Sequence, residues 1–223
     1  LIKPMFHYRW NFEADRREAS LRIATASVDP GTDPSKFAEM IGMHLMTRRE
    51  PLGCSDANAP LIERYLLEGA TRLNTHLQTR PFLFGDQLSV ADLGLGSLYY
   101  ELYSDPTPST LLRPFSALSA WAQRCMNPEG LGTGQSESWD SLSATLRPVL
   151  EHELSTHYLP WAHANAAALA QGDGTPFTVS LGGTDFTQPA QKYPAKSLRM
   201  LQAQWANLAP DTQADIRAII GEV

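Results

Sequence analysis

The sequence predicts an all-α helical bundle with a small β-hairpin and two further helices appended at its C-terminal end. Three observations lead to this prediction. A helix N-cap pattern at Ser89 precedes a long apolar run. Two other segments, 60–77 and 111–126, carry apolar residues at helical spacing along one side. Finally, Gly182 and Gly183 separate two β-prone runs, a pattern typical of a two-residue hairpin.

The central element of the predicted bundle is a helix from Val90 to Tyr103. The Ser89 side chain can accept a hydrogen bond from the backbone N–H of Asp92. The Asp92 carboxylate can in turn accept one from the N–H of Ser89, and the two bonds together make a capping box. Only Asp92 and Glu101 are charged in this helix, so no polar face remains for water and we expect the helix to be buried. Ser89 and Asp92 are therefore expected to have a structural role.

Two glycines, Gly94 and Gly96, lie inside this helix although glycine lowers helix propensity. We expect them to let a neighbouring backbone approach closely.

The first twelve residues are dense in aromatic side chains, and we expect a strand or an irregular segment that packs on the domain. In a second interpretation, aromatic side chains such as Tyr8 and Trp10 line an apolar ligand cleft. His7 stands alone in the sequence, and a lone histidine is more often a core or surface group than a catalytic one. Residues 13–29 support a helix.

A helix is expected to begin at Asp33, as the cap, and Pro34, as the first helical residue, and to continue to Glu50. Its apolar side chains recur at helical spacing, and we expect this face to belong to the core. The residues on that face are Phe37, Met40, Ile41, His44 and Leu45.

Three predicted helices make up the middle of the chain. The first, 60–77, has an apolar stripe and is stopped by Pro81. The central helix is stopped by Pro106 and Pro108, because proline cannot continue a helix. The third helix covers 111–126.

A long helical region is predicted over residues 138–170, bent or broken at Pro148 and Pro160. His152 and His157 lie in this region, five residues apart. On an α-helix, two side chains at this spacing diverge by well over about 100°, so we do not expect a shared metal ion.

Glycine-rich segments mark two loops. Residues 130–134 are expected to form a flexible loop, because the strand and the Lys-Ser/Thr pair of a nucleotide-binding loop are missing. The hairpin predicted around Gly182 and Gly183 is too small to stand alone and must lie on the helical body. Two helices, 194–208 and 210–221, are predicted to follow it.

Composition and charge exclude several classes of protein. The hydrophobic fraction of 43% and the charged fraction of 19% are those of an ordinary globular chain. A net charge of −6 without a basic run argues against binding to nucleic acid or an anionic membrane. No apolar stretch approaches the ~20 residues that span a bilayer. Cys54 and Cys125 lack a CxxC spacing, which favours a cytoplasmic location with two free thiols.

Residues 82–93, FLFGDQLSVADL, resemble the loop and buried-helix start of the glutathione transferase C-terminal domain. In that family an aromatic pair, Gly-Asp, Ser-x-Ala-Asp and an apolar run occur in this order. Residues 114–121, PFSALSAW, resemble the next helix of the same domain. The resemblance implies an all-α bundle of the glutathione transferase C-terminal type over residues 1–172, with the hairpin and helices of 173–223 packed on it.

The same resemblance implies a protein that conjugates or exchanges glutathione on a small apolar electrophile. In the family, an N-terminal thioredoxin-like domain activates the thiol, and this sequence shows no such half. We therefore assign no catalytic residue, no metal and no cofactor to this chain, and expect it to be cut from a longer protein that uses glutathione as co-substrate. The candidates for an electrophile pocket are Tyr8 and Trp10, because of their aromatic side chains, together with Phe37, Met40 and His44, whose helix faces the cleft between the two domains in the family that the sequence resembles.

An alternative is a non-catalytic binding or dimerisation module built on the same helical domain. Both hypotheses allow a homodimer and a small hydrophobic ligand, and only the first requires a thioredoxin-like domain as partner. The sequence does not decide whether the parent protein is an enzyme, because a fold alone does not specify a reaction.

Overall fold

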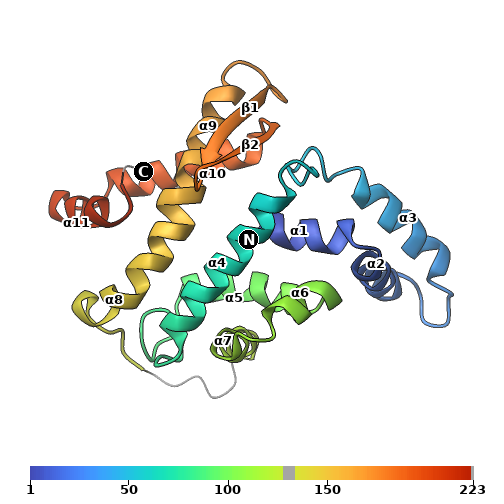
Figure 1. Cartoon of the computed structure of the whole chain (residues 1–223), viewed down its shortest axis with the longest axis horizontal. Helices are drawn as coiled ribbons and strands as arrows, with labels where there is room; N and C mark the ends of the chain where they lie inside the picture. Colours follow the sequence, from blue (N-terminus) through green and yellow to red (C-terminus); the bar gives the residue numbers. More distant parts are fainter. Residues whose placement is uncertain (128–133, 222–223) are drawn as a thin grey trace. The chain divides into compact units, whose positions relative to one another are not determined.

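The computed structural model describes residues 1–127 and 134–221 (Figure 1). Its contacts form two compact units, Leu1–Trp139 and Asp140–Val223, which we call unit 1 and unit 2. Most of the glycine-rich segment expected to be a flexible loop, residues 130–133, lies outside the described residues. The domain boundary predicted between residues 172 and 173 is not tested by this grouping and stays a prediction.

Unit 1 is helical, as predicted. Helix α2 packs against α1 and α3, α4 packs against α1 and α7, and α5 packs against α7. The helices of this unit are α1 (Ile2–Asn11), α2 (Glu13–Ser27), α3 (Ser35–Met46), α4 (Ala59–Leu77), α5 (Val90–Tyr103), α6 (Pro106–Leu112) and α7 (Ser116–Met126).

Helix α1 replaces the strand or irregular segment expected for the first twelve residues, so that prediction is wrong. Tyr8 and Trp10 are both buried. The rings of Tyr8 and Phe12, one helical turn apart, are stacked with their centroids 5.5 Å apart. Aromatic residues at this spacing lie on one side of a helix and can form its buried face.

Helix α5 begins and ends as predicted, but it is not buried all round. Asp92, Tyr99 and Leu102 face the interior, whereas Val90 and Tyr100 are exposed. The expectation of a helix without contact to water is therefore wrong for one of its sides. Low charge in a helix does not require burial, because much of any protein surface is apolar.

The two glycines of α5 differ in what surrounds them. A Cβ atom at Gly96 would lie 2.8 Å from both Cβ and Sγ of Cys125 in α7, whereas a Cβ atom at Gly94 would meet nothing within 4 Å. A neighbouring helix therefore approaches Gly96 closely, although the nearest atoms belong to a side chain and not to the backbone that was predicted. No element approaches Gly94, so the prediction is wrong there.

We expect opposite effects from alanine at these two positions. Gly96→Ala should lower the free energy of unfolding by about 2 kcal/mol, because the added methyl group overlaps Cys125. Gly94→Ala should raise it by about 0.5 to 1 kcal/mol through better helix propensity. Urea unfolding of both variants provides the measurement. Equal effects at the two sites would contradict the α5–α7 packing.

The connection between α5 and α7 also differs from the prediction. Pro106 and Pro108 end α5, but they also open the short helix α6, and α7 begins only at Ser116. Proline fits the first turn of a helix because the N–H it lacks has no helical acceptor there. The buried carboxylate of Asp15 accepts a hydrogen bond of 2.8 Å from the backbone N–H of Thr107, which satisfies another donor of that turn.

Unit 2 contains a continuous helical segment made of α8 (Trp139–Leu150), η1 (Glu151–Tyr158) and α9 (Leu159–Leu169). The sequence predicted a bend or a break at Pro148 and Pro160. The helical segment continues through both prolines, so the predicted break is wrong. Instead, the segment between these prolines forms a π-helix, which is wider than an α-helix.

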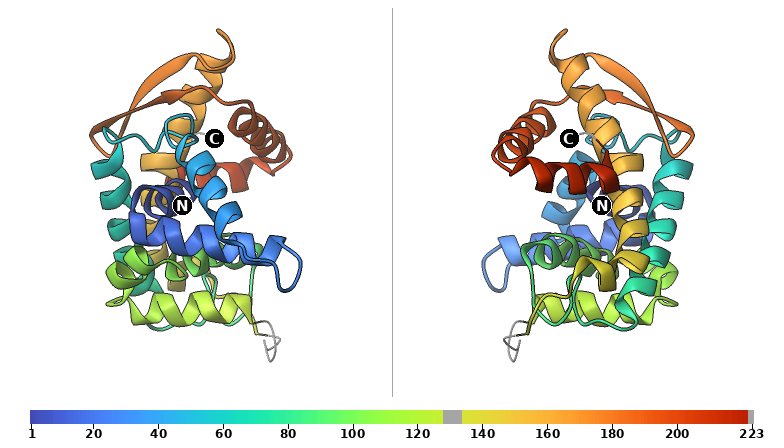
Figure 2. Two further views of the ribbon diagram at one scale, coloured as in Figure 1. Left: turned by 90° about the vertical axis from the view of Figure 1, so that its right-hand side faces the viewer. Right: turned by 90° about the vertical axis from the view of Figure 1, so that its left-hand side faces the viewer.

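The predicted hairpin is confirmed in unit 2. Strands β1 (Pro176–Leu181) and β2 (Thr184–Pro189) pair antiparallel, with Leu181 opposite Thr184 across the two-glycine turn. Figure 2 shows the hairpin, in orange, beside α9, and β1 packs against that helix. Two helices follow, α10 (Lys192–Ala206) against α9 and α11 (Pro210–Ile220) against η1.

Within the described ranges, none of the helices has the length and apolar character needed to cross a membrane.

Candidate functional site

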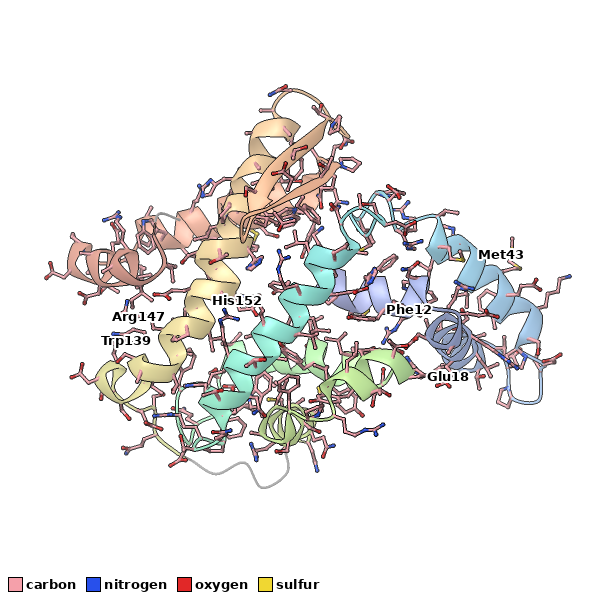
Figure 3. The ribbon with its side chains drawn as sticks, in the orientation of Figure 1. Phe12, Glu18, Met43, Trp139, Arg147 and His152 are labelled. Atoms are coloured by element: carbon pink, nitrogen blue, oxygen red, sulfur yellow. The ribbon has the colours of Figure 1, made fainter. Side chains whose placement is uncertain are left out.

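An exposed apolar surface on α3 is the first candidate site. The helix buries only Ala38 and Gly42, and a Cβ atom at Gly42 would lie 2.9 Å from Oγ of Ser20 in α2. Because the two helices meet through small side chains, the larger side chains of α3 point elsewhere. We call the exposed residues Phe37, Met40, Met43, His44 and Met46 the α3 surface; Met43, labelled in Figure 3, is 65% exposed.

The structure therefore corrects the predicted orientation of α3. Its apolar face was expected to belong to the core, but Phe37, Met40 and His44 are exposed to solvent. A patch of methionine and phenylalanine side chains is well suited to irregular apolar ligands, because methionine is flexible and polarizable.

The five predicted pocket residues do not lie on one surface. Phe37, Met40 and His44 share the α3 surface, whereas Tyr8 and Trp10 belong to α1 and are only 2% and 3% exposed. The pocket as a set of five residues stays a prediction. Its α3 members are accessible to a ligand in this structure, and its α1 members are packed inside unit 1.

A histidine–carboxylate pair lies next to Tyr8 and was missed by the sequence reasoning. His7 is fully buried, and its Nε2 atom lies 2.9 Å from Oε1 of Glu63 in α4. The rings of His7 and Tyr8 meet edge-on, with centroids 5.1 Å apart. Because 56 residues separate His7 from Glu63, no local sequence pattern could have shown the pair.

Tyr8 is poorly suited to act as a base toward a thiol. Burial raises the pKa of its hydroxyl group, and the charge of Glu63 raises it further. Because its pKa is raised, Tyr8 stays a neutral phenol at physiological pH and does not take a proton from a thiol.

Neither cysteine of the chain is a candidate nucleophile. Burial raises the pKa of the Cys54 thiol to about 11, against smaller opposite effects of Lys3 and Arg49. Burial raises the pKa of the Cys125 thiol to about 12, with a further contribution from Asp92. Since the thiolate is the reactive form, both groups are inert near neutral pH.

The two histidines of η1 lie closer together than predicted. The rings of His152 and His157 are 4.6 Å apart between centroids, and Nδ1 of His157 lies 2.7 Å from the backbone oxygen of His152. The predicted divergence assumed an α-helix, and the wider π-helix changes the angle between residues five apart. Among the described residues, no three histidine, cysteine or acidic side chains form a group that could hold a metal ion.

The capping box at the start of α5 is confirmed, and it is larger than predicted. The N–H of Ser89 donates to Oδ2 of Asp92 over 2.9 Å, and Oγ of Ser89 accepts from the N–H of Asp92 over 3.2 Å. In addition, Oδ1 of Asp92 accepts bonds of 2.8 Å from the N–H of Leu83 and from Nε1 of Trp121. One buried carboxylate thus joins the loop before α5, the start of α5 and the middle of α7.

These features define a class of protein: a helical domain organised by the buried carboxylate of a capping box, which a tryptophan from a later helix contacts. Residues 56–124 match the family model described as Glutathione S-transferase, C-terminal domain. This match confirms, over these residues, the resemblance to the glutathione transferase C-terminal domain that the sequence shows. Comparisons of the chain with curated proteins and with solved structures gave no match.

Proposed function

We propose that unit 1 is the electrophile-binding side of a glutathione-transferase-like protein that conjugates or exchanges glutathione on a small apolar electrophile. The observation that carries this proposal is the α3 surface. Phe37, Met40 and His44 are candidates for the pocket from the sequence, and all three are accessible on one helix. An apolar surface with few polar groups binds by shape and area, as expected for an electrophile site.

The thiol-activating group of such a protein would come from outside this chain. The pKa values of both cysteines and of Tyr8 are raised, so neither cysteine forms a thiolate at neutral pH and Tyr8 does not act as a base toward a thiol. Following the pattern of the family, we propose that a thioredoxin-like N-terminal domain binds and activates glutathione as co-substrate. We also propose a cytoplasmic location, where both cysteines would remain free thiols as they are in the structure.

A double variant tests the α3 surface directly. Phe37→Ser with Met40→Ser should weaken binding of an apolar fluorescent probe, 8-anilinonaphthalene-1-sulfonate, by about tenfold, because roughly 1 to 2 kcal/mol of apolar contact is lost. Fluorescence titration of the chain measures this affinity. The matched control is Val90→Ser with Met126→Ser, which removes two other exposed apolar side chains of unit 1.

Equal losses in the two double variants would contradict a specific site on α3. Kinetics of the full gene product then test the reaction: the α3 variant should raise KM for an aryl halide electrophile and leave KM for glutathione unchanged. The chain alone should show no heat of glutathione binding by calorimetry.

The alternative hypothesis, a non-catalytic binding or dimerisation module, makes the opposite kinetic prediction. Its full gene product would not conjugate glutathione above the uncatalysed rate. Sedimentation of the chain would then show a stable dimer or a hetero-complex that the α3 variant disrupts.

A further inference from the structure

Half of the methionines of the chain lie on one helix at regular spacing. Met40, Met43 and Met46 occupy every third position in the second half of α3, whereas the other three of the six methionines are scattered along the chain. These three residues are 57%, 65% and 40% exposed, so their thioether side chains are accessible from solvent. Met43 is labelled on α3 in Figure 3.

The spacing allows the three sulfur atoms to approach one point. Residues three or four apart are neighbours on a helix surface, with Cβ atoms about 5 to 6 Å apart. Met43 is therefore a neighbour of both other methionines, and the flexible, unbranched side chains can turn toward each other without moving the backbone. His44 is exposed and is a neighbour of Met40, and its ring has no hydrogen-bond or ion-pair partner among the described residues.

The charges near these side chains favour a positive ion of low charge. The group lies toward the C-terminal end of α3, and this end of a helix carries a partial negative charge. Lys36 and Glu39 are exposed on the same helix and have opposite charges, so together they add little net field.

The kind of ligand atom determines which metal ion the group selects. Thioether sulfur is uncharged and soft, and such ligands select Cu(I). Mg²⁺ and Ca²⁺ require oxygen ligands, and Zn²⁺ is bound by thiolate, imidazole or carboxylate groups. Thioethers lie outside the histidine, cysteine and acidic groups considered above.

We propose that Met40, Met43 and Met46 bind one Cu(I) ion, with the ring of His44 as a further ligand. Imidazole nitrogen is compatible with copper. Binding exchanges the previous ligands of Cu(I) for protein ligands, and copper keeps its oxidation state. This proposal adds a metal ion that the sequence interpretation did not assign. It does not rest on the function proposed above, although its ligands belong to the α3 surface.

The two cysteines do not compete for the ion in the folded chain. A thiolate is also a soft ligand for Cu(I), but Cys54 and Cys125 are only 0% and 3% exposed. The accessible soft ligands of α3 are therefore its thioethers.

Nuclear magnetic resonance of the methionine methyl groups tests the site residue by residue. The chain, labelled with ¹³C in these methyl groups, is titrated without oxygen with Cu(I) added as its acetonitrile complex. The signals of Met40, Met43 and Met46 should shift together. Those of Met126 and Met200, which are also exposed, should stay in place. An excess of Mg²⁺ in place of Cu(I) should shift none of them.

Variants measure the contribution of single ligands to the affinity. Met43→Leu removes the central sulfur but keeps an apolar side chain with good helix propensity, and should weaken Cu(I) binding at least about tenfold. His44→Ala should also weaken it. Met126→Leu is the matched control and should leave the affinity unchanged.

Two results would overturn the proposal. Equal shifts of Met126 and the α3 methionines would show that any accessible thioether binds the ion, and an unchanged affinity in Met43→Leu would show that α3 does not hold it. An unchanged affinity in His44→Ala would overturn the role given to the ring. Because no glutathione or electrophile is present, these results do not depend on whether the full protein conjugates glutathione.

Discussion

Replacing Asp92 with alanine is expected to lower the free energy of unfolding of unit 1 by about 4 kcal/mol. The Asp92 carboxylate is fully buried and accepts bonds from the backbone of Ser89 and Leu83 and from Nε1 of Trp121. Each buried donor left without an acceptor costs about 1 to 3 kcal/mol, and the loss falls on three parts of the unit at once. Urea unfolding followed by tryptophan fluorescence measures the change.

An asparagine at the same position separates hydrogen bonding from packing. Asp92→Asn can keep an acceptor toward Leu83 and Trp121, but its amide NH₂ group would then face the N–H of Ser89, so we expect about half of the alanine effect. Asp86→Ala, in the exposed part of the same loop, is the control and should change stability by less than about 0.5 kcal/mol. A small loss for Asp92→Ala would show that the carboxylate does not organise the fold.

The second large effect is expected at a buried ion-pair network that joins α1, α2 and the end of α5. Asp105 is fully buried; its Oδ2 accepts from Nε of Arg9 over 2.6 Å, and its Oδ1 accepts from Nη2 of Arg22 over 2.9 Å. Asp105→Ala should cost about 3 to 5 kcal/mol, because it leaves the Arg9 guanidinium buried with one partner fewer. Thermal unfolding of the variant and the parent gives the difference.

The surface pair Arg49–Asp56 is the matched control for this network. Its atoms are 2.7 Å apart, nearly the same separation, but Asp56 is exposed to solvent. Asp56→Ala should therefore cost no more than about 1 kcal/mol. If Asp56→Ala and Asp105→Ala had equal effects, burial would not determine the strength of these pairs.

Local patterns predicted those parts of the fold that local contacts determine. The capping box requires only Ser89 and Asp92, three residues apart, and the hairpin requires only the two glycines between its strands. The bonds from Asp92 to Leu83 and Trp121 could not be predicted, because they depend on how the loop and α7 are placed around α5.

The orientation of α3 was missed because apolar residues were assumed to face the core. A second signal was available: Ser20 and Ala24 in α2, and Ala38 and Gly42 in α3, are pairs of small residues four apart. Such pairs let two helices approach closely, and here they outweigh the attraction of the larger apolar side chains for the interior. The α3 part of the candidate site follows from this packing.

The remaining differences have physical causes that single residues do not show. The π-helix between Pro148 and Pro160 depends on the whole segment, since either proline alone is also compatible with a kink. The His7–Glu63 pair joins distant parts of the chain, and so does the contact of Cys54 with Lys3. Only the folded structure brings these groups together.

The shallow burial of α3, which buries only Ala38 and Gly42, has a consequence for motion. A helix that buries only Ala38 and Gly42 is held by little apolar area, and such elements open locally at a low free-energy cost. Amide hydrogens of α3 would then exchange with solvent sooner than those of α4, which buries a long apolar stripe. A ligand bound to the α3 surface would slow that exchange, and part of its binding energy would be spent on ordering the helix.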